Sequence, residues 1–174
     1  MRVVAVLAVV AALVSSAAAQ DSFKDSGKDG AKDKAQQPQQ DTTKPASVDE
    51  VFRQFDLFGV WAADCQEPPS PDNPHLSISS PAAGVVLEKH DIGEDYEANQ
   101  YSILSAERLS SSRLAVEVVF LPGSDREERQ KLIFRVRDHT RRTMFNQPEG
   151  GPVRVKDGIA LANHSRTPTL KKCG

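Results

Sequence analysis

Two cysteines are the residues whose chemistry follows most directly from their positions. Cys65 lies near the start of a region of alternating apolar residues, and Cys173 is the penultimate residue of the chain. Thiols pair in oxidising compartments, so we expect a Cys65–Cys173 disulfide in preference to two free buried thiols. Closing a loop of about 100 residues is worth roughly 4–5 kcal/mol in the chain-entropy model. The bridge would tie the first strand to the C-terminal end.

The motifs of the common enzyme classes are missing from the sequence. It contains no G-x-S-x-G elbow, no H-E-x-x-H pair, no phosphate-binding glycine loop and no S-x-x-K. The four histidines are far apart, at expected strand ends or turns: His75, His90, His139 and His164. A barrel can bring two of them together at a metal, but solvated loop histidines are favoured. We therefore expect no catalytic residue, metal site or cofactor.

Basic residues gather around one expected hairpin and the strand that follows it. They are Arg135, Arg137, Arg141, Arg142, Arg154 and Lys156. On neighbouring strands they would make a cationic strip able to bind an anionic polymer, a lipid headgroup or an acidic partner. The favoured alternative is the outward face of an amphipathic sheet, partnered by Glu127, Glu128 and Asp138. The formal net charge of −2 argues against nucleic acid as a partner.

The N-terminus has the features of a secretion signal. Residues 1–19 combine Arg2, an apolar run over 3–14 and a small-residue stretch that ends in three alanines before Gln20. This order is the one that a signal peptidase recognises. The apolar run is too short to span a bilayer comfortably, so cleavage leaves no integral membrane segment. The sequence predicts an exported protein, located in the periplasm of a bacterium.

Two regions of different composition follow the signal. Residues 20–46 repeat Lys-Asp pairs at four-residue spacing and then become rich in Gln, with almost no large apolar side chain. Such a segment cannot bury enough surface to become ordered, so we expect a disordered tether. Residues 47–174 have the size of one small domain. It opens on a capping box from Ser47 to Glu50, and Val51, Phe52 and Phe55 predict one short helix.

The rest of the domain alternates apolar and polar residues with a period of two. In 113–121 one face carries Leu114, Val116 and Val118, and 131–137 repeats the pattern with Leu132 and Phe134. The other expected strands are 58–63, 75–79, 84–90, 99–109, 140–146 and 152–160. About eight antiparallel strands without a crossover helix exclude an α/β fold and leave an all-β meander barrel or a sandwich. The expected disulfide favours the barrel, because it brings the two ends of the meander together.

An eight-stranded barrel is narrow, and it is either filled by its own side chains or able to hold one small ligand. The inward residues that could line a ligand site are Tyr101, Ile103, Val116, Val118 and Phe134. Gly59-Val60-Trp61 resembles the Gly-x-Trp motif of the lipocalins and their calycin relatives. The resemblance implies that Trp61 closes one end of the barrel beneath a basic residue near the C-terminus, for which the candidates are Lys171, Lys172 and Arg166.

A longer set of residues resembles uncharacterised exported proteins of alphaproteobacteria. It runs from Trp61 and Asp64-Cys65 through Asn99-x-Tyr101 and 155–158 to Lys172-Cys173, and it implies no known activity. Taken together, we expect an exported, non-enzymatic binding protein that carries or senses a small apolar or amphipathic ligand. The alternative is a periplasmic inhibitor or protein-interaction module that acts through loops 68–74 and 122–126, and the third is an unrecognised hydrolase.

Overall fold

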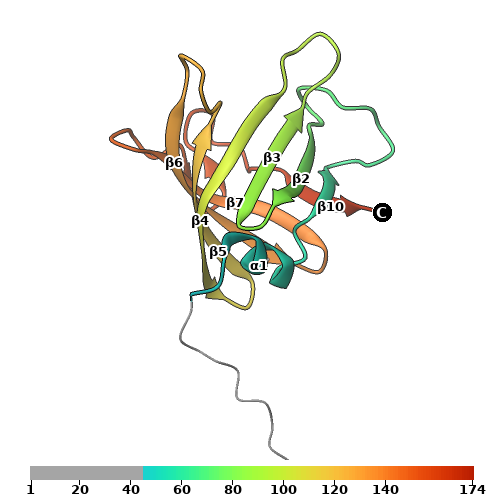
Figure 1. The fold of residues 1–174 in the computed structure, drawn as a ribbon. Coiled ribbons are helices and arrows are strands. Elements are labelled where there is room, and N and C mark those ends of the chain that lie inside the picture. The colour runs from blue at the N-terminus through green and yellow to red at the C-terminus, as the bar shows by residue number, and fades with distance from the viewer. Residues whose placement is uncertain (1–44) are drawn as a thin grey trace, which may run out of the picture. The chain divides into compact units, whose positions relative to one another are not determined.

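The computed structural model describes residues 45–174 (Figure 1). The expected signal peptide (1–19) and nearly all of the expected tether (20–46) lie outside the described residues. The elements in chain order are α1 (Val48–Gln54), β1 (Gly59–Ala62), β2 (His75–Ala82), β3 (Val85–Asp91), β4 (Asn99–Ser110), β5 (Arg113–Phe120), β6 (Glu128–Arg137), β7 (Thr140–Pro148), β8 (Val155–Lys156), β9 (Ile159–Ala160) and β10 (Thr169–Cys173). No helix among residues 45–174 is long and apolar enough to cross a membrane.

The sheet closes on itself. Strands β1 to β7 pair antiparallel in chain order, and β10 pairs with both β7 and β1, so these eight strands form a ring. The predicted all-β barrel with one short N-terminal helix is therefore confirmed. The predicted disulfide is also present: Cys65 and Cys173 have Cα atoms 5.6 Å apart and are separated by 108 residues in sequence. It joins the segment after β1 to the last residue of β10.

Helix α1 covers one end of the barrel, the lower end in Figure 1. The capping box at Ser47 starts it, and the helix buries Val51 and Phe52. Beside it Trp61 is 1% exposed, and its indole N–H donates to the Leu57 carbonyl over 2.7 Å. Because this N–H is satisfied, the ring can be buried without the cost of an unpaired donor.

A basic side chain lies over Trp61, as the lipocalin resemblance implied. Of the three candidates it is Lys172, whose Nζ is 5.9 Å from the ring centroid. The same ammonium donates to the backbone carbonyl and to the carboxylate of Asp56, over 3.1 Å and 2.5 Å. Gly59, the first residue of β1, has a φ of +112°, a backbone conformation that residues other than glycine rarely adopt. The first residue of the motif is thus required by the backbone.

The expected strands were wrong at the C-terminal end in two respects. Residues 152–160 do not form one strand, because Asp157 and Gly158 have φ values of 52° and 74° and turn the chain between β8 and β9. Two left-handed residues in a two-residue loop make the tight turn for which Asp-Gly is a strong signal. Strand β10 was missing from the expected set. Its sequence, Thr-Leu-Lys-Lys-Cys, buries only Leu170 fully and shows no apolar alternation.

Candidate ligand-binding site inside the barrel

The barrel contains a cavity of about 280 Å³ that is partly open to solvent. No residue of α1 lines it, and neither do Trp61 and Leu114, which pack at the end that α1 covers. The apolar part of its wall consists mainly of Leu76, Ile103, Val118, Leu132, Phe134 and Leu170. The cavity therefore occupies the part of the barrel away from α1, with a wall that is mostly apolar.

The structure brings four of the five expected lining residues together. Tyr101, Ile103, Val118 and Phe134 line the cavity, as parts of β4, β5 and β6. Val116 also points inward and is 2% exposed, but it packs in the apolar core and does not line this cavity. The narrow interior is thus filled by side chains over part of its length and hollow over the rest.

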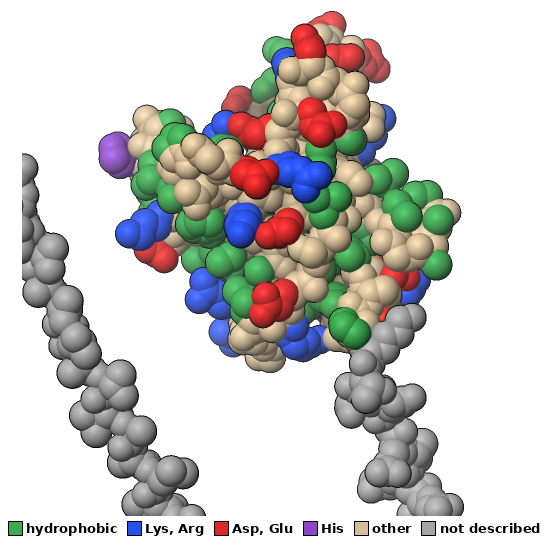
Figure 2. All heavy atoms as spheres, turned by 60° about the vertical axis from the view of Figure 1, so that its left-hand side comes forward, with side chains coloured by type: hydrophobic (Ala, Val, Ile, Leu, Met, Phe, Trp, Pro, Cys, Tyr) green, Lys and Arg blue, Asp and Glu red, His purple; other side chains and the backbone are tan. Residues whose placement is uncertain are grey.

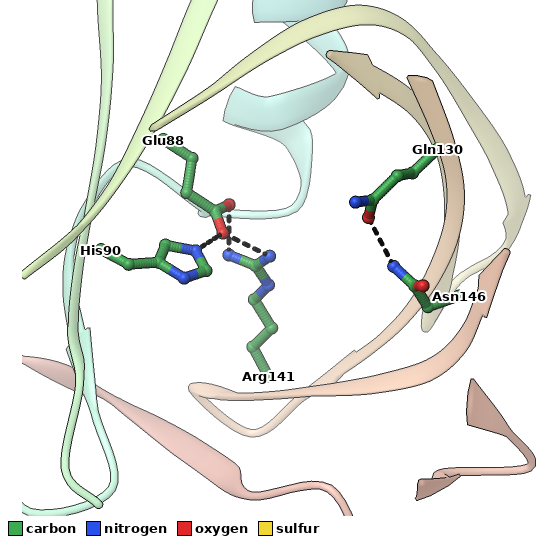
Figure 3. Close-up of polar contacts among 5 residues, drawn as sticks. All are labelled: Glu88, His90, Gln130, Arg141 and Asn146. Carbon is green, nitrogen blue, oxygen red and sulfur yellow. Dashed lines mark hydrogen bonds and ion pairs between the residues drawn. The ribbon is translucent and has the colours of Figure 1, made fainter. Parts of the chain in front are cut away.

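A buried ion pair forms the polar part of the cavity wall. The Glu88 and Arg141 side chains are 5% and 4% exposed and come from β3 and β7. Arg141 donates from Nη1 to Oε2 over 2.7 Å and from Nη2 to Oε1 over 3.1 Å. His90 Nε2 lies 2.6 Å from the same Oε1 (Figure 3). The guanidinium also lies 3.9 Å from the centroid of the Phe134 ring.

The geometry keeps this pair ionised. Burial raises the pKa of Glu88, but the Arg141 guanidinium and the hydrogen bond from His90 outweigh it and lower that pKa to about 2. At neutral pH the Glu88 carboxylate is therefore negative and balances the positive charge of Arg141. Two-point contact of a guanidinium with a carboxylate is the strongest geometry that such a pair adopts.

Tyr101 lies beside the pair on the neighbouring strand, opposite Glu88 in the register of β3 and β4. Its ring packs at a tilt against the His90 ring, with centroids 4.8 Å apart, and against the Phe120 ring at 5.0 Å. Burial and the nearby Glu88 carboxylate raise the pKa of Tyr101 to about 12. The hydroxyl therefore stays protonated over the physiological range and remains a hydrogen-bond donor.

A second set of polar side chains is linked by hydrogen bonds, and within it Asn146 lines the cavity and bonds to Gln130 (Figure 3). Arg154 holds the Glu128 carboxylate in two contacts of 2.7 Å each. Glu128 accepts from Gln130 Nε2, and Gln130 Oε1 in turn accepts from Asn146 Nδ2, both over 2.7 Å. Asn146 Oδ1 is buried and has no hydrogen-bond partner among residues 45–174. The chain of bonds fixes which way each amide faces, because reversing either one would place two acceptors together.

The six basic residues that were considered as a strip do not all lie on one face, because Arg141 points into the barrel. Arg135 and Arg142 are opposite each other in the register of β6 and β7. The remaining contacts differ: Arg137 pairs with Asp138, Arg154 pairs with Glu128, Arg142 donates to Gly158 and Thr167, and Arg135 and Lys156 are exposed. On the face that Figure 2 brings forward, acidic and basic side chains are intermixed. The arrangement resembles the partnered outer face of a sheet more closely than a cationic strip.

Sequence reasoning missed the polar residues inside the barrel, namely Glu88, Gln130 and Asn146. A signal for Glu88 existed, since a period of two places it on the same face as Val86, which is 0% exposed. It was obscured because Glu88, Lys89 and His90 together resemble the solvated end of a strand. Residues 45–174 contain no group of three or more His, Cys, Asp or Glu side chains placed to hold a metal ion.

Comparisons with protein-family models, with curated proteins and with solved structures find no match to this chain. Geometry alone therefore defines the class of protein. It is a closed eight-stranded antiparallel barrel, consistent with a lipocalin-like barrel, with a plugged end and an internal cavity that has one polar wall.

Proposed function

We propose that this protein is a non-enzymatic binding protein whose barrel cavity holds one small amphipathic ligand. The observation that carries the proposal is the cavity itself, in which an apolar wall surrounds a few convergent polar groups. Concave sites of this composition are the usual form of small-molecule sites in proteins. The apolar wall would supply affinity, and Tyr101, His90 and Arg141 would orient the ligand.

The size of the cavity limits the ligand. A volume of about 280 Å³ has room for on the order of ten non-hydrogen atoms, at the roughly 30 Å³ that one water molecule occupies in the liquid. The ring of strands and the disulfide between Cys65 and Cys173 support a preformed site, which loses little conformational entropy on binding. A short aliphatic or single-ring compound fits within this volume, and a long-chain lipid would extend beyond it.

A calycin-like carrier or sensor is the more specific form of this proposal. Trp61 at the plugged end and Lys172 over its ring support it, because they match the roles that the resemblance implied. The signal-like residues 1–19 and the disulfide support export, to the periplasm in a bacterium. For an exported barrel of this kind, we therefore propose the role of a carrier or a sensor.

Native mass spectrometry of protein purified gently from its own host tests the proposal. We expect an added mass of the size of a small molecule, which is lost on unfolding. A matched pair of variants places the ligand: Val118→Phe fills the cavity, whereas Leu87→Phe enlarges a side chain that is 39% exposed. Val118→Phe should lose the added mass, and Leu87→Phe should keep it. An equal added mass in both variants would place the ligand outside the cavity and contradict the proposal.

A second candidate function is an inhibitor or interaction module that acts through the loop before β2. The Asn73 side chain holds this loop in one shape, since it accepts from the Asp64 amide over 3.0 Å and donates to the Asp64 carbonyl over 2.9 Å. Rigid exposed loops are suited to binding a protein partner. Pull-down from periplasmic extract should then return one stoichiometric partner. Asn73→Ala, which frees the loop, should lose that partner and keep any cavity ligand.

A further inference from the structure

The charged groups that line the cavity do not cancel. Among residues 45–174 the only carboxylate that lines it is Glu88, and Arg141 already holds this carboxylate in two contacts. A second arginine, Arg142, also lines the cavity and makes no ion pair with a carboxylate of the described part of the chain. When His90 is neutral, the wall therefore has one positive charge that the protein does not compensate.

Arg142 lies on the side of the cavity that extends beyond the ring of eight strands. It is the last residue of β7 to pair with β10, and β7 then changes its neighbour to β8. On this side the cavity also reaches Val155 of β8, and Thr167 and Pro168 of the segment before β10, none of which belongs to the ring. Arg142 can thus line the cavity although alternation places it on the other face of β7 from Arg141.

Neutral groups hold the Arg142 guanidinium in place. Its Nε donates to the Thr167 hydroxyl over 3.1 Å, and its Nη2 donates to the Gly158 carbonyl over 2.6 Å. The Thr167 hydroxyl in turn donates to the Thr143 carbonyl over 2.7 Å. These bonds use two of the five N–H groups, so both groups on Nη1 and one on Nη2 have no partner among residues 45–174. A positioned guanidinium with such groups and no counter-charge is suited to bind a carboxylate.

We infer, on the basis of the proposed cavity binding, that the ligand is a short-chain carboxylate whose head group pairs with Arg142 and whose apolar part occupies the barrel. One uncompensated positive charge on the wall matches one negative charge on the ligand, so the occupied cavity is neutral. The buried Arg141 is not the anchor, because Glu88 already neutralises it. The head group therefore lies between β7 and the segment before β10, away from the buried ion pair.

Isothermal titration calorimetry with three ligands of equal size in non-hydrogen atoms tests this inference on the wild-type protein. They are octanoate, which is an anion, methyl heptanoate, which is neutral, and nonylammonium, which is a cation. At pH 8, above the usual titration range of imidazole, we expect octanoate to bind at least about tenfold more tightly than either of the others. Equal or tighter binding of methyl heptanoate or nonylammonium would overturn the inference. If none of the three binds, the proposed function fails instead.

The Arg142→Gln variant tests the anchor. Removing the guanidinium should weaken octanoate about tenfold or more and leave methyl heptanoate within about twofold of the wild type. Arg135→Gln is the matched control, since Arg135 lies opposite Arg142 in the register of β6 and β7, is exposed and does not line the cavity. An equal loss of octanoate in both variants would assign the effect to net charge and contradict the inference.

Two further outcomes of this experiment are decisive. Unchanged binding of octanoate to a folded Arg142→Gln protein would contradict the inference as well. If this variant does not fold, the comparison of octanoate with methyl heptanoate on the wild-type protein decides the question.

The Thr167→Val variant tests the positioning of Arg142. It removes the acceptor of the Arg142 Nε and should weaken octanoate about three- to fivefold without changing methyl heptanoate. Thr167→Ser keeps the hydroxyl and should restore the affinity for octanoate. A merely structural role of Thr167 would weaken both ligands alike, and that result, or unchanged binding of octanoate to Thr167→Val, would contradict the positioning role.

Discussion

The two ends of the barrel are built from the same eight strands but filled differently. At the end that α1 covers, Phe52, Leu57, Trp61 and Leu114 are at most 1% exposed, and the indole N–H of Trp61 has its acceptor. The other part of the interior holds a cavity and the buried pair of Glu88 and Arg141. The tight apolar packing at the end that α1 covers stabilises the barrel, and this stability permits the other end to remain hollow and polar.

The division would suit the proposed binding role. A cavity forfeits dispersion contacts, and a buried ion pair gives little net stability, so both must be supported elsewhere. The packed end and the closed ring of strands supply that support and hold the polar wall in one geometry. The expected consequence is that substitutions at the plugged end reduce stability, whereas substitutions at the cavity end change ligand binding.

The disulfide should produce the largest effect, because it stabilises the ring that both ends share. Reducing the Cys65–Cys173 bond, which closes 108 residues of sequence separation, should lower the free energy of unfolding by roughly 4–5 kcal/mol in the chain-entropy model. Urea unfolding with and without reductant measures this difference. The double variant Cys65→Ser/Cys173→Ser is the control, and reductant should not affect it. A wild-type transition that reductant leaves in place would contradict the prediction.

A pair of leucine truncations should separate the two ends. Leu114→Ala at the plugged end removes a fully buried side chain and should cost about 3–5 kcal/mol. Leu170→Ala, at a cavity-lining residue that is 7% exposed, should cost about 2–3 kcal/mol, since that side chain already borders empty space. Urea unfolding gives the stabilities and calorimetry gives the ligand affinity. Only Leu170→Ala should change the affinity, and an equal change in both variants would remove the distinction between the ends.

Acid should weaken the cavity end through Glu88. Its pKa is about 4.5 in the unfolded chain and about 2 in the fold, so the unfolded state binds a proton more readily. The stability contributed by the ionised carboxylate is present above about pH 4.5 and is lost as the pH falls toward about 2. Urea unfolding between pH 6 and pH 2 should show this decline.

A double variant provides the control for the acid effect. Glu88→Leu/Arg141→Met replaces the pair by apolar side chains of similar length, a change that is often neutral or stabilising at neutral pH. Its stability should therefore fall less steeply than that of the wild type over the same acid range. A decline as steep as that of the wild type would assign the acid sensitivity to other carboxylates, such as Asp56 and Glu128, whose pKa values their lysine and arginine partners also lower.

The contrast between the ends also explains what the sequence could predict. From Leu114 to Val118 in β5 and from Leu132 to Val136 in β6 every inward position is apolar, so the period of two predicted both the strands and the inward face of Leu114 and Phe134. In β3 the same reasoning fails, because Val85 and Leu87 are apolar yet 40% and 39% exposed, while Glu88 points inward. Alternation predicts a face only where the chemistry of the two faces differs.

Arg141 shows a further limit. It stands next to Arg142 in β7, so alternation requires that one arginine face inward but does not say which. The pairing register decides it: Arg141 lies opposite the inward Val136, and Arg142 opposite the outward Arg135. That register depends on contacts between distant strands, and so does the match between Arg141 and a carboxylate 53 residues earlier. Neither the β6–β7 register nor the partner of Arg141 can be read from the residues next to Arg141 in the sequence.

The smallest predicted effect concerns the contact of Lys172 with Asp56 and Trp61 at the plugged end. Lys172 lies over Trp61 and pairs with Asp56, but the Asp56 side chain is 64% exposed and water screens the attraction. Lys172→Met keeps most of the apolar stem over the ring, so unfolding in urea should change by less than about 1 kcal/mol. In high salt the wild type and Lys172→Met should have the same free energy of unfolding, because salt screens exposed ion pairs. A loss of several kcal/mol, or a change in ligand affinity, would mean that the charge over Trp61 supports the cavity as well as the plug, and the two ends would then be coupled.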